Sequence, residues 1–389
     1  MKLMICPPLI LSKPSAGVRR VLDVYSRFRR HQVVLCVDSG SLQDSEPAVL
    51  AKLSSFREIV KSHSEPGLLL PWSVLRLASV ARRADAVVCY DEFPPSVFYS
   101  YLVAKLSRKP LIIFYHIIIP ATARRFSGSA FSPLSALYRM AIRYSSAAIC
   151  LDNGKEYGIF RSFFPDKPLH LAFNGAECAD TLSGDAVGHS FEGLYMGVLQ
   201  PRKGIMYFPD IWKDVSSRVP GAKLRIVGKS VNHNAETLRQ KLVASGLGEN
   251  VEMPGFVSEE EKRTMLNNAK VFIFPSSDEG VSLALLEALS SGVPAVLWDL
   301  PVFERFNEGV LKAHYPDTKD YADKVVSLIK DEAMRRETGK RGRTWVMEHM
   351  SWDNAAAREE DIFDRIASDM HIPDSPREES GPSARGAVQ

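Results

Sequence analysis

Hydrophobic residues in the first 172 positions gather in short runs rich in Val, Ile and Leu, which are typical of strands buried on both faces. The segments between these runs, such as 18–30 and 96–106, have the periodicity of amphipathic helices. Strands that alternate with helices predict βαβ units and a parallel sheet. The predicted strands are Lys2–Cys6, Gln32–Asp38, Ala86–Tyr90, Leu111–Ile118, Ala147–Leu151 and Leu169–Phe173.

A second series of the same kind begins near residue 192. Its predicted strands are Leu194–Leu199, Lys223–Val227, Val251–Met253, Val271–Pro275 and Pro294–Trp298. Residues 174–191 between the two series lack periodicity and are rich in small and polar residues, which predicts a linker. The pattern therefore predicts an α/β protein with two Rossmann-like, doubly wound parallel-sheet domains, 1–175 and 192–350, that face each other across a ligand-binding cleft. Residues 372–389 contain few large apolar side chains and are expected to be a disordered tail.

Composition is consistent with a chain that remains inside the cell. An apolar content of 45% in 389 residues is enough for two hydrophobic cores. The five cysteines are widely spaced and include no C-x-x-C pair, which favours free thiols in a reducing compartment and argues against a zinc cluster. The longest apolar run, 110–121, is too short to span a bilayer, and the N-terminus does not resemble a secretory signal. These features predict a cytoplasmic protein, soluble or peripheral to a membrane.

Charge is distributed unevenly between the two halves. Residues 1–172 hold 23 Lys and Arg against 12 Asp and Glu, whereas the remainder holds 26 against 34. The basic first half indicates an anionic partner, although nothing in it favours nucleic acid. Within 122–146, Arg124, Arg125, Arg139 and Arg143 alternate with aromatic residues and Leu. This pattern fits an amphipathic element on an anionic membrane, and it also fits a core-facing helix with solvated arginines.

The segment 276–294 contains two glutamates, Glu279 and Glu287, separated by seven residues. A helix is expected to begin near Ser282 and to end at Gly292, and its first amides can bind a phosphate or a sugar hydroxyl. Glu287 is the only charged residue between positions 281 and 298, and a ribose diol would supply the hydrogen bonds that it needs. The alternative is that Glu287 faces solvent and that Glu279 is an ordinary loop charge.

Two adjacent cations follow the first strand of the second series. Lys203 precedes Gly204 at the expected mouth of the cleft, where its ammonium group could neutralise the charge that develops on a departing diphosphate. Arg202 could assist with its fork of donors. The alternative is a solvated first turn of a helix, where a cation is mildly unfavourable unless an anion is bound.

Taken in order, these motifs resemble those of the retaining family-4 glycosyltransferases of the GT-B fold. Residues 279–287 resemble the E-x7-E signature of that family, and 195–205 resemble its phosphate-binding loop. The further matching pieces are 223–230 (second strand and glycine turn), 253–261 (nucleobase loop), 173–177 (the N-G at the domain junction) and 351–353 (the start of the last helix). The resemblance covers 173–365 well. Before that range, Ala16-Gly17 and His116 fit the glycine loop and the strand-end histidine of the family.

The resemblance implies a sugar transfer from a UDP- or GDP-sugar to a glycan or a lipid-linked acceptor held by the first domain. It implies no cofactor and no metal, and residues 351–370 would form a helix that crosses back to the first domain. Lys203, Glu279 and His116 would serve catalysis. The donor would be bound by Gly17, Arg202, Lys203, Val257, Glu279, Gly280, Val281, Ser282, Leu283 and Glu287, with Glu279 on the sugar, Glu287 on the ribose and the Val257 backbone on the base.

The sequence departs from the family at two places. Val198 occupies the position of an arginine in the usual G-R-L, so that either Arg202 replaces this arginine or one phosphate cation is missing. Residues 299–301 lack the usual glycine pair, which makes Glu304 a loose match. The first departure leaves open a non-catalytic subunit that binds or activates a partner enzyme.

An epimerase or phosphorylase is disfavoured because the chain lacks a pyridoxal-phosphate lysine signature. A nicotinamide enzyme is disfavoured because no G-x-G-x-x-G follows a strand.

Overall fold

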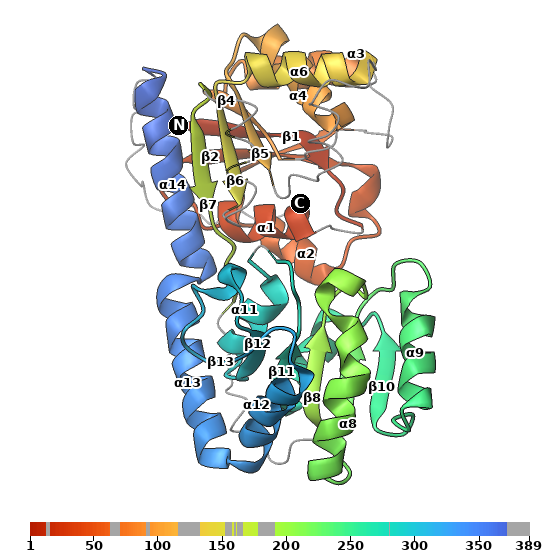
Figure 1. Ribbon diagram of the computed structural model, residues 1–389. Helices are drawn as coiled ribbons and strands as arrows, with labels where there is room; N and C mark the ends of the chain where they lie inside the picture. Colours follow the sequence, from red (N-terminus) through yellow and green to blue (C-terminus); the bar gives the residue numbers. More distant parts are fainter. Residues whose placement is uncertain are drawn as a thin grey trace, which may run out of the picture. The chain divides into compact units, whose positions relative to one another are not determined.

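The computed structural model divides into two compact units (Figure 1). The first unit comprises 1–149, 164–170 and 359–389, and the second comprises 150–163 and 171–358. The structure describes residues 1–12, 16–62, 71–90, 94–115, 133–151, 158, 161, 166–177, 191–279 and 281–371. His116, Gly280, Arg124 and Arg125, most of the expected linker and the expected tail lie outside these residues.

The first unit is built on a seven-stranded sheet with the order β3-β2-β1-β4-β5-β6-β7. Every pairing in it whose register is described is parallel, as predicted. The order reverses between β1 and β4, which is the point where open α/β sheets bind ligands. The strands are β1 (Lys2–Leu9), β2 (Gln32–Asp38), β3 (Glu58–Ser62), β4 (Ala86–Cys89), β5 (Leu111–Tyr115), β6 (Ala147–Leu151) and β7 (Leu169–Ala172).

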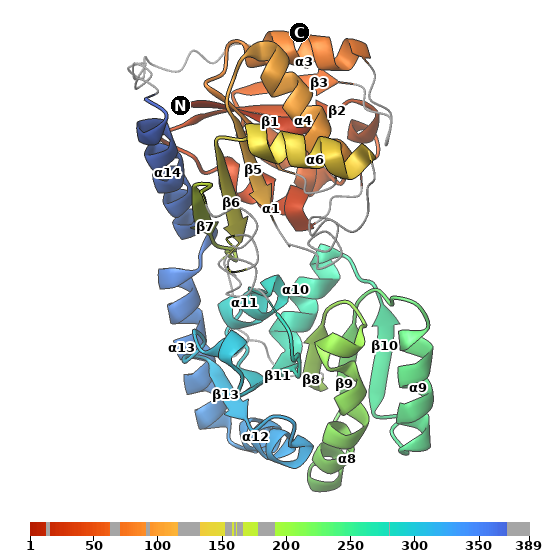
Figure 2. The same cartoon turned by 45° about the horizontal axis from the view of Figure 1, so that its top comes forward.

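Helices cover both faces of this sheet. Figures 1 and 2 show α1 (Ala16–Tyr25) and α2 (Pro47–Leu53) on one side and α3 (Pro71–Ala81), α4 (Pro94–Ser107) and α6 (Pro133–Tyr144) on the other. Because both faces are covered, the central strands consist mainly of apolar residues, and the cysteines of β1, β2, β4 and β6 are buried. The second half of α14 (Trp352–Asp369) belongs to this unit, where Glu359 accepts a hydrogen bond from the buried guanidinium of Arg20 at 2.7 Å.

The second unit contains a six-stranded sheet with the order β10-β9-β8-β11-β12-β13, again parallel in every described pairing. Its order reverses between β8 and β11. The strands are β8 (Phe191–Met196), β9 (Leu224–Val227), β10 (Val251–Gly255), β11 (Ala269–Phe274), β12 (Ala295–Trp298) and β13 (Val310–Ala313). The helices are α8 (Phe208–Arg218), α9 (Asn234–Ala244), α10 (Glu259–Asn268), α11 (Leu283–Ser290), α12 (Thr318–Lys330) and α13 (Glu332–His349). Helix α12 packs on α8 and on β11 to β13, whereas α11 packs against α13.

Two strands were not predicted from the sequence. Both β3 and β13 are edge strands, and no residue of β3 except Ser62 is fully buried. An edge strand has a neighbour on one side only and carries polar residues that break the apolar pattern of the inner strands. The prediction of two doubly wound parallel sheets is confirmed.

Candidate functional site

A short 3₁₀ turn, η2 (Pro201–Lys203), follows β8 and lies against the loop after β11. Gly204 ends this turn with φ +74°, and a Cβ on it would lie 1.8 Å from the carbonyl oxygen of Pro275. Only glycine combines this left-handed backbone with so close an approach. The carbonyl oxygen of Arg202 accepts a hydrogen bond from the Ser277 amide at 3.1 Å. The turn and the loop are therefore held together at the switch point between β8 and β11.

Gly204→Ala is expected to lower the free energy of unfolding of the second unit by about 2–4 kcal/mol, because backbone strain and a steric clash add together. Gly221→Ala is the matched control. Gly221 also has a left-handed backbone, φ +81°, but nothing lies within 4 Å of its would-be Cβ. Strain alone should cost about 1 kcal/mol there. Urea unfolding measures both losses, and equal losses would contradict the packing described for Gly204.

The cation and the carboxylate predicted to act in catalysis lie together in this loop cluster. The Lys203 ammonium donates to Oε1 of Glu279, and the two side chains are only 15% and 5% exposed. Ser276 Oγ donates to the same oxygen at 2.8 Å. Burial lowers the pKa of Lys203 below its usual value, although Glu279 acts in the opposite direction. The pair therefore places one positive and one negative group, each largely buried, at the carboxyl edge of the sheet.

Arg202 is exposed and lies beside this pair. Its Nη1 donates to the carbonyl oxygen of Asp278 at 3.1 Å, and its Nε donates to Oε1 of Gln200 at 3.2 Å. The guanidinium is therefore held on the loop that carries Glu279. Val198, at the position of the usual arginine, is 37% exposed. The prediction that Arg202 replaces the missing arginine is compatible with this placement and is not tested by it.

Helix α11 begins where the sequence predicted. Ser282 is its N-cap residue, Leu283 is its first residue, and Gly292 follows its end with φ +76°. Among the described residues, the Ser282 side chain makes no capping hydrogen bond. The first amides of a helix are donors without intrahelical partners and are suited to bind an anion.

The two motifs at the junction lie next to each other and contact the start of α11. Ala176 forms a parallel bridge with Ser351, and a Cβ on Gly175 would lie 2.7 Å from the amide nitrogen of Trp352. Asn174 Nδ2 donates to the carbonyl oxygen of Val281 at 3.0 Å. Sequence reasoning gave Asn174 no role of its own, yet it fixes the backbone immediately before α11.

The second carboxylate, Glu287, has a partner that the sequence argument overlooked. Lys262 on α10 donates to Glu287 Oε1 at 2.6 Å and lies 2.6 Å from Glu259. Burial alone would lower the pKa of Lys262, but Glu287 and Glu259 outweigh it, and the pKa is raised. The side chain of Glu287 is also 31% exposed. The inference that Glu287 needs a ligand to satisfy it therefore fails, and its contact with ribose stays a prediction.

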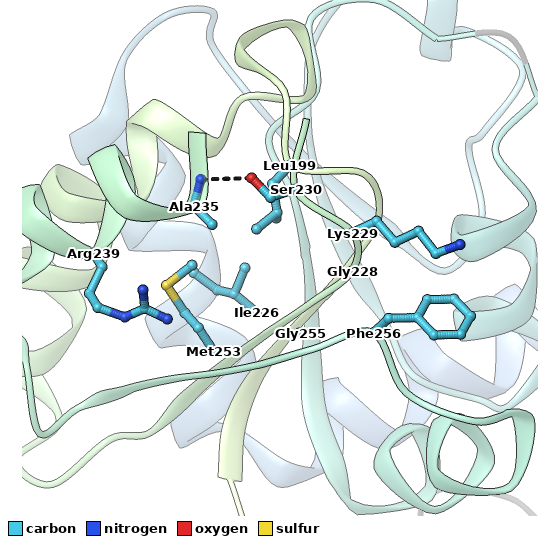
Figure 3. Close-up of a pocket in the computed structure, with 10 residues that line it drawn as sticks. All are labelled: Leu199, Ile226, Gly228, Lys229, Ser230, Ala235, Arg239, Met253, Gly255 and Phe256. Carbon is cyan, nitrogen blue, oxygen red and sulfur yellow. Dashed lines mark hydrogen bonds between the residues drawn. The ribbon is translucent and has the colours of Figure 1, made fainter. Parts of the chain in front are cut away.

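A pocket of about 330 Å³ opens at the carboxyl ends of β9 and β10 (Figure 3). Figure 3 shows Arg239 and Met253 at one end of the pocket and Lys229 and Phe256 at the other. The residues that line it are Leu199, Ile226, Gly228, Lys229, Ser230, Ala235, Arg239, Met253, Gly255 and Phe256. Three of them belong to the predicted nucleobase loop, 253–261. An apolar floor with a few polar groups at the rim is typical of small-molecule sites.

The exposed aromatic ring at the rim of this pocket is that of Phe256, which is 64% exposed. The Lys229 ammonium lies over the ring at 4.7 Å from its centroid. Val257, the predicted base contact, is half-buried against the core of the second unit. Phe256 is thus the aromatic face that this part of the chain offers to a planar ligand, and sequence reasoning had singled out only its neighbour.

In the first unit, Gly17 is the second residue of α1, so its amide belongs to the first turn of that helix. His116 follows β5 directly and lies outside the described residues.

No group of three or more His, Cys, Asp or Glu side chains in the described ranges could hold a metal ion. No helix in the same ranges is long and apolar enough to cross a membrane.

Comparison with known proteins gives these observations a family context. Residues 188–345 match the model of the family described as Glycosyl transferases group 1. Over 215 residues, the chain is 24% identical to a GDP-mannose:cellobiosyl-diphosphopolyprenol alpha-mannosyltransferase of Xanthomonas oryzae pv. oryzae, covering 54% of this chain and 55% of that protein. It is 27% identical over 173 residues to a phosphatidyl-myo-inositol mannosyltransferase of Mycobacterium leprae, covering 43% and 45%. The chain thus spans about half the length of these relatives.

Similarity of structure extends over nearly the whole chain. A crystal structure of Anabaena Alr3699/HepE in complex with UDP and glucose superposes with a TM-score of 0.69, covering 94% of this chain and 100% of that chain at 15% identity. At this identity the likeness concerns the fold alone, and it agrees with the GT-B fold class, with two Rossmann-like domains, that was predicted from the sequence.

Proposed function

We propose that this chain, whose residues 188–345 form a domain of the glycosyl transferases group 1 family, transfers a hexose from a UDP- or GDP-sugar to a glycan or lipid-linked acceptor. The observation that carries the proposal is the pairing of Lys203 with Glu279. Glu279 lies in the loop that leads to the first turn of α11, and Lys203 lies in the η2 turn that packs against this loop; both are inside the matched range. Donors and cations fixed in this way stabilise charge as it develops on a leaving diphosphate.

The roles of the individual residues follow the family resemblance. Lys203 and Arg202 neutralise the diphosphate together with the amides of 281–283. Glu279 binds the donor sugar, and Glu287 exchanges its bond with Lys262 for one with the ribose. Val257 contacts the base through its backbone, and Phe256 offers its exposed ring to the same base. Gly17 and His116 of the first unit complete the site in this proposal.

The reaction proposed is a transfer with retention of configuration. The acceptor hydroxyl attacks the anomeric carbon on the face from which the diphosphate leaves, and it passes its proton to that leaving group. Positioning and electrostatics carry such a step without a covalent nucleophile. Two relatives named for mannosyl transfer support a hexose donor, and both of their names refer to a lipid. A lipid-linked acceptor and a peripheral place at the cytoplasmic face of a membrane fit the basic first half of the chain.

A thermal-shift screen of the full chain against UDP-, GDP- and ADP-sugars tests the donor. A sugar nucleotide present at 100 times its dissociation constant should add about 2.7 kcal/mol of stability. In a unit of roughly 200 residues this raises the melting temperature by about 5–10 °C. A UDP- or GDP-sugar is expected to produce the shift. No shift with any of the three would remove the basis of the proposal.

The alternative of a non-catalytic subunit gains nothing from Val198 alone, because Lys203, Arg202 and both glutamates are retained. A partner-binding subunit would bind the sugar nucleotide without cleaving it. Donor cleavage by the purified chain separates the two.

Transfer should not depend on a divalent metal. Lys203, Arg202 and the first amides of α11 would supply the positive groups at the diphosphate that Mg²⁺ or Mn²⁺ supplies in other enzymes. Activity in excess EDTA is therefore expected to remain within about twofold of the untreated protein, since the electrostatic stabilisation comes from the chain itself. Loss of activity on chelation, with recovery on addition of Mg²⁺ or Mn²⁺, would contradict this assignment.

A further inference from the structure

Helices α3, α4 and α6 form one layer on the first unit, with α4 packed between the other two (Figure 2). The described residues of this layer and of the turns that follow its helices, 71–85, 94–115 and 133–149, contain eight Lys or Arg and a single acidic residue, Asp85, which accepts a hydrogen bond from the Lys2 amide at 2.6 Å. The eight are Arg76, Arg82, Arg83, Lys105, Arg108, Lys109, Arg139 and Arg143. The layer therefore carries a large excess of positive charge, unlike a solvated helical face on which the two signs of charge are mixed.

Several cations elsewhere in the first unit are paired with carboxylates within the fold. Arg20 is paired with Glu359, and Arg30 is paired with Asp361 and Asp364 of α14. Lys52 is paired with Asp23. In the described part of the layer, by contrast, only Arg83 has a carboxylate within 4.0 Å, that of Glu58 at 3.8 Å. Among the described residues of the layer, the positive charge is thus offset by a nearby carboxylate at Arg83 alone.

Apolar side chains stand on the outer face of α3 together with these cations. Trp72 is 81% exposed and Leu75 is 52% exposed, and both share one helical face with Arg76, Ser79 and Arg82. Positions three, four and seven apart lie on the same side of a helix. A Trp and a Leu next to arginines on one face are the combination that lies in the interface of an anionic bilayer.

The other two helices of the layer expose side chains of the same kinds. Met140 of α6 is 40% exposed and Leu106 of α4 is 47% exposed, and exposed cations lie near both of them at Arg143 and Lys105. A partner that is polyanionic but has no apolar phase, such as an acidic polymer, would leave the Trp72 and Leu75 side chains unused. The joint occurrence of exposed apolar groups and unbalanced cations therefore favours a lipid surface.

We propose that the α3–α4–α6 layer is a docking surface for an anionic membrane, with Trp72 and Leu75 inserted at the level of the head groups and Arg76 and Arg82 against lipid phosphates. This surface includes α6, which lies in the segment 122–146 to which the sequence pattern first pointed, and it adds α3 and α4. It gives the proposed lipid-linked acceptor a membrane from which to be reached. The docking surface itself does not depend on the proposed function; only its role in reaching the acceptor rests on that function. Vesicle binding needs neither donor nor acceptor, so its failure would leave the proposed transfer intact.

The test is sedimentation of the full chain with vesicles of phosphatidylcholine alone or with one third phosphatidylglycerol, at low and at high salt. Binding is expected only to the anionic vesicles and should fall as salt rises. The double variant Arg76→Glu, Arg82→Glu and the double variant Trp72→Ala, Leu75→Ala should each reduce binding about tenfold or more. The control Lys213→Glu, Lys340→Glu makes the same change of net charge on exposed positions of the second unit and should bind like the unmodified chain.

Three outcomes would overturn the proposal. One is the absence of binding to anionic vesicles at low salt. Another is binding that both α3 variants retain, which would move the contact to another part of the chain. Equal binding of the Trp72→Ala, Leu75→Ala variant and the unmodified chain would also contradict insertion and would indicate a purely polyanionic partner. All four replaced side chains of α3 are exposed, so melting temperatures should be unchanged and loss of fold is excluded as a cause.

Discussion

Replacement of Lys203 by alanine is expected to lower the rate of sugar transfer by about 10²–10³-fold, which is the cost of removing one preorganised donor that faces developing negative charge. Lys203 is held in place by the η2 turn, by its bond with Glu279 and by burial that leaves 15% of its side chain exposed. Burial also lowers its pKa, because desolvation disfavours the charged form. A bound diphosphate would give that ammonium group a second anionic partner beside Glu279.

The effect should lie in kcat rather than in nucleotide affinity, because the diphosphate gains charge mainly as the sugar departs. Lys213→Ala, an exposed lysine on α8, is the matched control and should leave the rate unchanged. Arg202→Ala separates the two cations and should cost less, since Arg202 is exposed. A Lys203→Ala protein that folds normally and transfers sugar at the unmodified rate would show that the phosphate cation has been misassigned.

The two carboxylates are expected to have separable effects. Glu279→Ala should slow turnover by about 10²-fold with little change in nucleotide affinity, because this residue faces the donor sugar. Glu287→Ala should instead weaken nucleotide binding by about tenfold, through loss of a hydrogen-bonding carboxylate on the ribose. Steady-state kinetics for turnover and calorimetry with the nucleoside diphosphate measure the two effects.

Lys262 provides a control for the second carboxylate. Glu287 and Lys262 are bonded at 2.6 Å, so Glu287→Ala also leaves Lys262 with one partner fewer. Lys262→Met removes that bond from the other side and keeps Glu287. If Glu287 binds ribose, Lys262→Met should preserve or tighten nucleotide binding. Equal weakening by Glu287→Ala and Lys262→Met would indicate that the pair is structural and that the ribose is bound elsewhere.

The fold could be predicted to a large extent because its inner strands are buried on both faces. Gln32–Asp38 and Ala147–Leu151 were placed at the correct residues, since an uninterrupted apolar run has clear ends. Such runs do not occur in β3 and β13, which lie at the sheet edges and pair on one side only. The other two edge strands, β7 and β10, were nevertheless predicted, at Leu169–Phe173 and Val251–Met253, so an edge position weakens the apolar pattern without always removing it.

The candidate site could be predicted only where its residues are close in sequence or follow a strand. The start of α11 was correct because its glycines and its spacing are local signals. The bond from Lys203 to Glu279 joins residues 76 positions apart, and that from Lys262 to Glu287 joins residues 25 positions apart. No local pattern encodes these contacts. They form because the order of the strands in the sheet brings certain strand ends together. Phe256 was overlooked for a related reason, since its exposure is a property of the folded surface.

Release of a nucleoside diphosphate from sugar nucleotides by the purified chain tests the central claim most directly. The chain is incubated with UDP-, GDP- and ADP-hexoses in EDTA, and free nucleoside diphosphate is measured against the uncatalysed rate and against Lys203→Ala. One UDP- or GDP-sugar is expected to be cleaved, and Lys203→Ala should lose about 10²–10³-fold of that rate. A sugar nucleotide that binds and stabilises the chain but is cleaved no faster than in buffer, or cleaved equally by Lys203→Ala, would contradict a catalytic site built on Lys203 and Glu279.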